Sequence, residues 1–240
     1  MARKATRKTA RKPARTVAAR RPAAPTTERE KIIAAFLSLL ADKSFEAIGF
    51  SDIAERAGVS LAQLRGEFSS TLAILAAHVK ATDRALLAED FGEMAEEPAR
   101  ERLFDVLMRR LEMLAPHREA VRSLLRSARR NPPLALALNG LAVRSQQWML
   151  TAAGIGASGP LGMMRAQGLA VLFASVLGTW VRDDDPGQAR TLAALDRALA
   201  RGQRFAGLLD DLCSIPLRFG RLRRRRRRRR GEDSAESATA

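Results

Sequence analysis

Apolar residues recur three and four positions apart along most of the chain, the spacing that gathers them on one face of an α-helix. Alanine and leucine, which favour helix, are abundant, and β-branched residues are sparse. No segment alternates between apolar and polar residues for long, as a half-buried strand would. The pattern therefore predicts an all-α protein.

Helix-capping signals divide the first part of the chain. Thr27 and Ser60 each stand three residues before a Glu or Gln, the capping-box pattern that marks a helix start. Between them, Ser51 is expected to cap a second helix that ends at Gly58, because glycine readily adopts the left-handed conformation at a helix end. A fourth helix is predicted over residues 70–90. The core expected for this unit consists of Ile53, Ala54, Ala57, Val59, Leu64 and Phe68.

More helices are predicted from residue 100 onward, joined by short turns and a glycine-rich loop at residues 154–160. The uncharged apolar stretch over residues 166–181 has sixteen residues, whereas a helix that spans a bilayer needs about twenty. We therefore expect a buried core helix there and no stable membrane insertion. The predicted organisation is a tail over 1–25, a three-helix head over 26–80, a connecting helix and hinge over 81–99, a helical body over 100–212 and a second tail over 213–240.

The net charge of +16 is concentrated in the two tails. Residues 1–24 hold nine Lys/Arg and no acid, residues 216–230 hold ten Arg and no acid, and three acids follow in residues 231–240. The remainder of the chain has 23 basic and 23 acidic side chains and is neutral. Like-charged blocks with few apolar residues do not fold alone and favour polyanions such as DNA, RNA or anionic lipid. Cys213 is the only cysteine, so the chain forms no internal disulfide, which suits a reducing compartment.

Residues 51–68 read SDIAERAGVSLAQLRGEF, which has the outline of a helix, a glycine turn and a second helix. This outline fits a DNA-binding helix-turn-helix or any two packed helices in a bundle. Residues 26–80, above all DIAERAGVS ahead of Leu64 and Phe68, resemble the N-terminal domain of TetR-family transcriptional regulators. The resemblance implies a non-enzymatic, cytoplasmic, nucleoid-associated regulator that binds double-stranded operator DNA as a homodimer. It also implies a helical C-terminal domain that dimerises and often holds an effector.

The second helix of this unit departs from the family pattern at several positions. Arg65 stands where the family usually has Tyr, Glu67 where it has an aromatic residue, and Thr71 where it has a phosphate-binding Lys. Gly66 within the helix costs roughly 0.5–1 kcal/mol relative to Ala. A retained fold that no longer reads bases is therefore an alternative.

The solvent face of the helix after Gly58 is expected to contact DNA. Gln63 suits adenine, Arg65 suits guanine, and apolar side chains suit the thymine methyl. Hydroxyl side chains near the helix starts suit phosphate oxygens. The predicted DNA-binding residues are Ser60, Leu61, Ala62, Gln63, Arg65, Gly66, Ser70 and Thr71. With strong tails, such a helix would give DNA binding of modest sequence preference.

The body, from LFDVLMRR to ALDRALARG, is also similar to ubiquinone-biosynthesis accessory proteins, which share the fold but bind lipid. This resemblance implies an apolar cavity for a hydrophobic small molecule or lipid, with ordinary core packing as the alternative. The residues expected to line it are Trp148, Met149, Met163, Met164, Phe173 and Trp180. Apolar residues 208–222 beside the arginine block suit either a membrane-surface anchor or a plain tail.

Signals for catalysis, metals and cofactors are weak. His78 and His117 are far apart in sequence, and carboxylates do not cluster. The sequence GIGASG over residues 154–159 matches a dinucleotide-binding fingerprint but joins two predicted helices, so we interpret it as a loop. The acids of residues 183–185 are interpreted as a solvated turn. We expect no enzyme activity, no metal and no cofactor.

Overall fold

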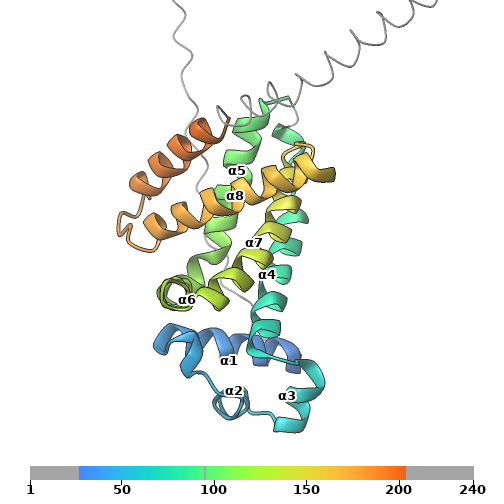
Figure 1. The fold of residues 1–240 in the computed structure, drawn as a ribbon, viewed down its shortest axis with the longest axis vertical. Coiled ribbons are helices and arrows are strands. Elements are labelled where there is room, and N and C mark those ends of the chain that lie inside the picture. The colour runs from blue at the N-terminus through green and yellow to red at the C-terminus, as the bar shows by residue number, and fades with distance from the viewer. Residues whose placement is uncertain (1–26, 95, 204–240) are drawn as a thin grey trace, which may run out of the picture.

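The computed structural model describes residues 27–94 and 96–203, and in this part of the chain all regular structure is helical (Figure 1). Three short 3₁₀ turns, η1 (Phe45–Ala47), η2 (Gly92–Met94) and η3 (Ala115–His117), join some of the helices. The helices are α1 (Glu28–Asp42), α2 (Phe50–Ala57), α3 (Leu61–Glu67), α4 (Thr71–Leu87), α5 (Ala99–Leu114), α6 (Arg118–Arg130), α7 (Pro132–Ala152), α8 (Gly159–Trp180) and a last helix over residues 189–203. The predicted all-α class is confirmed for these residues. Cys213, the arginine block and the first 25 residues lie outside the described residues.

Both predicted capping boxes are present. The Thr27 hydroxyl accepts the Glu30 backbone N–H at 3.2 Å, and the Ser60 hydroxyl accepts the Gln63 backbone N–H at 3.1 Å. The prediction that Ser51 caps α2 is wrong, because α2 already begins at Phe50. The Gly49 N–H instead donates to the Asp52 carboxylate at 3.2 Å. This hydrogen bond, with a smaller effect of Lys43, holds the pKa of Asp52 below its ordinary value.

The head is organised around the apolar core expected from the sequence. Ile53, Ala54, Leu64 and Phe68 are buried against α1 and α4, and Ala57 and Val59 pack at the edge of the same cluster. Gly58 ends α2 with a φ of +67°, a left-handed conformation that glycine adopts without steric cost. The turn at Gly58 therefore fixes the orientation of α3 relative to α2.

The head joins the body through two elements. In Figure 1, α4 rises from the head into the body, where it packs beside α5 and α7. α6 lies against α1, and two of its serines bond the chain after α1: the Ser123 hydroxyl donates to the Lys43 carbonyl at 2.7 Å, and the Phe45 N–H donates to the Ser127 hydroxyl at 3.1 Å. The head is thus held by α6 as well as by its own connecting helix.

α6 also contacts the end of α8. The guanidinium groups of Arg118 and Arg122 donate to carbonyls at the C-terminus of α8, namely those of Trp180, Val181 and Asp183. Carbonyls in the last turn of a helix have no partner within the helix, so they remain available to these arginines. The Trp180 carbonyl also accepts the Asp183 N–H at 3.1 Å and gains a second donor from Arg118. α6 therefore bridges the head and the C-terminal pair of helices.

α8 is only partly the buried core helix that its composition predicts. Ala166, Phe173 and Trp180 lie in the body core, whereas Val171 on another face is 60% exposed. The helix starts seven residues earlier than the uncharged stretch and has 22 residues. By length and composition alone α8 would suit a membrane span, a property that it shares with core helices of water-soluble proteins. One apolar face of α8 is left uncovered within the described chain.

Two polar features of the body differ from what sequence position suggests. The His78 and His117 rings, far apart in sequence, meet edge to face with their centroids 5.1 Å apart. Asp183, expected in a solvated turn, is 1% exposed and accepts hydrogen bonds from the Thr191 N–H and hydroxyl at 2.8 and 2.6 Å. Asp183 therefore caps the last helix instead of facing solvent.

Candidate nucleic-acid interface

α3 is a short helix with a buried inner face and an open outer face. Leu64 and Phe68 are 2% and 5% exposed and anchor α3 and the residue after it in the head core. The outer face carries Leu61, Ala62, Gln63, Arg65 and Gly66, all exposed as the sequence spacing predicts. In Figure 1, α3 lies at the extreme end of the molecule, away from the body. This placement leaves its outer face accessible to a large partner.

Gln63 is held by two hydrogen bonds. Its Oε1 accepts the Ser60 N–H at 2.8 Å, and its Nε2 donates to Glu28 Oε1 at 2.6 Å. To contact an adenine, Gln63 would have to leave these partners, at a cost of about 1 kcal/mol for each hydrogen bond. Gln63 therefore has a structural role, because it closes the capping box of α3 and links α3 to α1. This role competes with the base reading predicted for it.

Glu67 is neutralised by a residue of α1. Arg29 Nη1 lies 3.0 Å from Glu67 Oε2, and the Arg29 guanidinium stacks over the Phe68 ring at 4.4 Å from the centroid. Both side chains of the ion pair remain well exposed, so the pair adds little stability. Its main effect is electrostatic, because it offsets the carboxylate that would otherwise repel phosphate oxygens beside α3.

Arg65 is the free cation of this face. Its side chain is exposed and makes no hydrogen bond or ion pair with any residue in 27–94 or 96–203. The neighbouring Gly66 has open space where a Cβ would stand, so nothing crowds Arg65 from that side. A guanidinium in this setting can form a planar pair of hydrogen bonds with an acceptor edge.

The predicted phosphate-binding hydroxyls sit at helix starts. The Ser60 and Ser70 hydroxyl oxygens accept backbone N–H groups, which leaves each hydroxyl hydrogen able to donate outward. Thr71 is the first residue of α4 and half-buried. These three residues flank the outer face of α3 on both sides.

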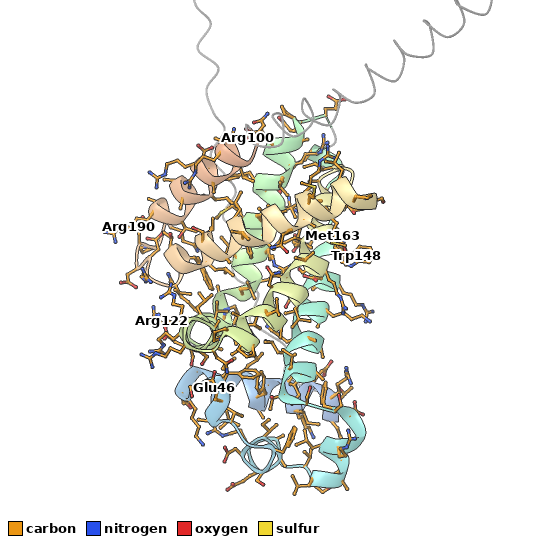
Figure 2. The ribbon with its side chains drawn as sticks, in the orientation of Figure 1. Glu46, Arg100, Arg122, Trp148, Met163 and Arg190 are labelled. Atoms are coloured by element: carbon orange, nitrogen blue, oxygen red, sulfur yellow. The ribbon has the colours of Figure 1, made fainter. Side chains whose placement is uncertain are left out.

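The six residues predicted to line a ligand cavity do not lie together. Met149, Phe173 and Trp180 are buried in the body core. Trp148, Met163 and Met164 are 57%, 50% and 51% exposed. Figure 2 shows Trp148 and Met163 near each other at one edge of the body.

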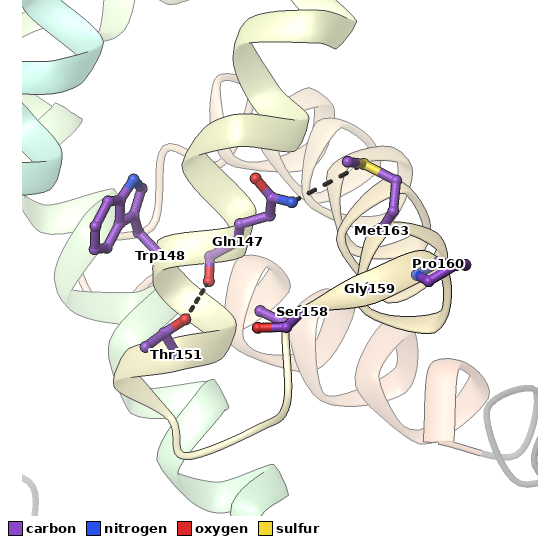
Figure 3. A pocket seen from close by; sticks show the side chains of 8 residues that line it. Gln147, Trp148, Thr151, Ser158, Gly159, Pro160 and Met163 are labelled. Carbon is purple, nitrogen blue, oxygen red and sulfur yellow. Dashed lines mark hydrogen bonds between the residues drawn. The ribbon is translucent and has the colours of Figure 1, made fainter.

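Two surface hollows lie beside these exposed residues. Trp148 and Met163 line a pocket of about 570 Å³, in which the Gln147 side chain reaches from α7 toward the Met163 sulfur (Figure 3). Met164 lines a larger groove of about 860 Å³ between α8, the last helix and the start of α5. The groove also includes Leu161, Leu169, Val171 and Leu172, so its walls are mainly apolar.

A buried polar cluster in the body had no signal in the sequence. Arg110 of α5 pairs with Asp83 of α4, and the Ser145 hydroxyl of α7 donates to the same carboxylate at 2.9 Å. These three residues are 3–7% exposed. Residues 27 and 62 positions apart cannot be paired from their spacing alone. The cluster ties α4 to the body.

No family model and no curated protein matches the chain. Its fold is similar to the crystal structure of a TetR transcriptional regulator from Nitrosomonas europaea, with a TM-score of 0.56, 22% identity and coverage of 73% of this chain and 97% of that one. The fold is also similar to that of a TetR-family transcriptional regulator from Syntrophomonas wolfei, with a TM-score of 0.54, 16% identity and coverage of 75% of this chain and 94% of that one.

The chain has the TetR-regulator fold. Both alignments cover nearly the whole of the solved chains, so the likeness includes the body as well as the head. Within this fold, the helix-turn-helix outline predicted from the sequence is formed by α2, the Gly58 turn and α3. The outer face of α3 is accordingly the candidate interface.

Proposed function

We propose that the protein is a transcriptional regulator that binds operator DNA as a dimer, with α3 in the major groove. The observation that carries the proposal is Arg65, an exposed and unpaired guanidinium on the outer face of a helix whose inner face is fixed in the head core. Arginine pairs with guanine O6 and N7 through two parallel hydrogen bonds. Arg65 is therefore the principal base-reading residue in this proposal.

Its neighbours supply weaker contacts. Leu61 is 55% exposed although it is a large apolar residue, and together with Ala62 it suits the methyl group of thymine. Ser60, Ser70 and Thr71 would donate to phosphates and set the register of α3 on the duplex. With Gln63 engaged by Ser60 and Glu28, the operator is expected to have few strongly specified base pairs in each half-site.

Dimerisation would use the uncovered face of α8 and the last helix. Val171 is exposed beside Gly168, Ala174 and Ser175, which are small enough to let a second helix approach closely. An exposed apolar stripe of this kind on a helical bundle favours packing against a second copy. Two heads related by a twofold axis would meet half-sites about 34–36 Å apart, one turn of DNA.

A hydrophobic effector would bind in the apolar groove of about 860 Å³ beside Met164 and Leu169. The groove shares Gly168, Val171 and Ser175 with the proposed dimer face, so the second copy would cover that wall of the groove. It would act by preferring one spacing of the two heads over the other, since a ligand shifts an equilibrium only through different affinities for the two states. We place the protein in the cytoplasm, in association with the nucleoid. The same groove also suits a lipid tail, so a lipid-binding accessory protein without an operator is the alternative function.

Selection of bound duplexes from a random-sequence library by the full-length protein tests the proposal. We expect a palindromic sequence with half-sites one turn apart, each with a guanine at a fixed position. Enrichment without any shared sequence, together with stoichiometric binding of a fluorescent fatty acid, would support the lipid-binding alternative instead. Sedimentation of the free protein as a monomer at micromolar concentration would contradict the dimeric arrangement.

A further inference from the structure

The start of α1 lies along one side of α3. Glu28 Oε1 accepts a hydrogen bond from Gln63 Nε2 at 2.6 Å, and Arg29 Nη1 lies 3.0 Å from Glu67 Oε2. Arg29 Nη1 also donates to the Glu67 carbonyl at 3.3 Å. Gln63 and Glu67 are four residues apart and therefore occupy the same side of the helix. Two consecutive residues of α1 thus hold this side of α3, the held side, at two points.

The other side of α3, the open side, is formed by Leu61 and Arg65, which are also four residues apart. Successive residues of an α-helix are turned by about 100°, so the open side lies roughly opposite Gln63 across the outer face. Neither side chain has a hydrogen bond or ion pair with any residue in 27–94 or 96–203, and both are exposed. Ala62 and Gly66 lie between the two sides. The outer face of α3 therefore has one side engaged by α1 and one side available to a partner.

We propose that Glu28 is a positioning residue that sets the sequence specificity of α3 by keeping Gln63 away from the bases; this inference rests on the proposed function. A glutamine recognises adenine through both ends of its amide, which contact adenine N6 and N7. In this structure the two ends of the Gln63 amide are bonded to the Ser60 N–H and the Glu28 carboxylate. The bond to the carboxylate is charge-assisted and roughly twice as strong as a bond to a neutral acceptor such as adenine N7. Glu28 therefore outcompetes adenine for the Gln63 amide.

Glu28 lies outside the helix-turn-helix, 35 residues before Gln63, and yet decides which residues of α3 read DNA. While its carboxylate is present, only the open side of α3 reads bases. Without the carboxylate, Gln63 is bonded through its oxygen to the Ser60 N–H alone, and its amide nitrogen is released. The amide can then turn toward the groove and pair with adenine. A protein that lacks the Glu28 carboxylate therefore reads one additional base pair in each half-site.

Selection from the random-sequence library by full-length variants tests this role of Glu28. Glu28→Ala releases the Gln63 amide nitrogen, Gln63→Ala removes the amide, and the double variant does both. Glu55→Ala is the matched control, because it removes an exposed glutamate of α2 and leaves the bond between Glu28 and Gln63 in place. Circular dichroism checks that each variant keeps the helical fold.

The wild-type, Gln63→Ala and Glu55→Ala proteins are expected to select the same sequence. Glu28→Ala selects this sequence with one further position in each half-site, at which adenine is preferred by roughly 5- to 150-fold, the discrimination that one bidentate pair gives. The double variant loses the added adenine. Removal of a carboxylate near phosphates also raises the affinity for every duplex, so the added adenine, and not the affinity, is the decisive readout.

Three results would overturn the role of Glu28 and leave the proposed function intact, because each still yields an operator. One is a Glu28→Ala protein that selects the wild-type sequence without an added adenine. Another is an adenine in the wild-type operator that Gln63→Ala abolishes, since Gln63 would then read a base in the presence of Glu28. The third is an added adenine that persists in the double variant. A wild-type protein that selects no sequence at all would instead contradict the proposed function, and this inference with it.

Discussion

The buried histidine pair predicts a loss of stability in mild acid. His78 of α4 packs against His117 of η3, and Arg110 of α5, which pairs with Asp83, adds positive charge nearby. Burial, followed by the charges of His117 and Arg110, lowers the pKa of His78 from 6.5 to about 4. Burial also lowers the pKa of His117. Both rings are therefore neutral in the folded protein at neutral pH.

The size of the effect follows from the pKa of His78. Below pH 6.5 the unfolded chain binds a proton that the folded protein excludes until about pH 4. Each pH unit in this window costs about 1.4 kcal/mol, so about 3 kcal/mol of stability is present above pH 6.5 and lost as the pH falls to 4. Stopping at pH 5 limits the loss to about 2 kcal/mol and keeps most carboxylates ionised.

Urea unfolding followed by circular dichroism, at fixed protein concentration and at half-unit steps from pH 7.5 to 5.0, measures this loss. His78→Phe keeps a ring against His117 and removes the titrating group. We expect the wild-type protein to lose about 2 kcal/mol more than His78→Phe between pH 6.5 and 5.0. Equal pH dependence in the two proteins would refute the reasoning, whatever their absolute stabilities.

Four further substitutions test the packing by urea unfolding at pH 7.5. Gly66→Ala should raise stability by about 0.5–1 kcal/mol, because a Cβ there meets open space in a helical segment; a decrease would contradict this. Gly162→Ala should lower it by about 1–3 kcal/mol, because a Cβ would stand 2.1 Å from the Ala157 carbonyl carbon; an unchanged midpoint would contradict the close approach. Asp83→Ala should cost about 3–5 kcal/mol by leaving Arg110 buried without its partner, whereas Glu89→Ala, which breaks an exposed pair, should cost about 1 kcal/mol or less.

The elements of the fold that depend on neighbouring residues could be predicted from the sequence. The capping boxes at Thr27 and Ser60 and the glycine turn at Gly58 are local, and all three are present as expected. Ser51 failed as a cap because the N-cap of α2 is Gly49, two residues before Ser51, and the Asp52 carboxylate accepts the Gly49 N–H there. When two polar side chains compete for the same helix start, spacing alone does not decide between them.

The candidate site could be predicted less completely. The exposed face of α3 followed from helical spacing, but the partners of its side chains did not. Gln63 is bonded to Glu28, 35 residues earlier, and Glu67 is paired with Arg29, 38 residues earlier. Likewise, Met149 and Met163 fit a common apolar pattern, yet one is buried and the other exposed. Contacts of this kind depend on tertiary packing, which the sequence pattern does not specify.

The affinity of Arg65→Ala for the selected operator tests the central claim most directly. Arg126→Ala, which removes an exposed arginine of α6 far from α3, is the matched control. If Arg65 reads guanine, its loss should cost about 1–3 kcal/mol, a drop in affinity of roughly 5- to 150-fold, and should relax the preference for guanine at one position of each half-site. The control should bind like the wild type. An Arg65→Ala protein that binds the operator with unchanged affinity and unchanged base preference would contradict the account.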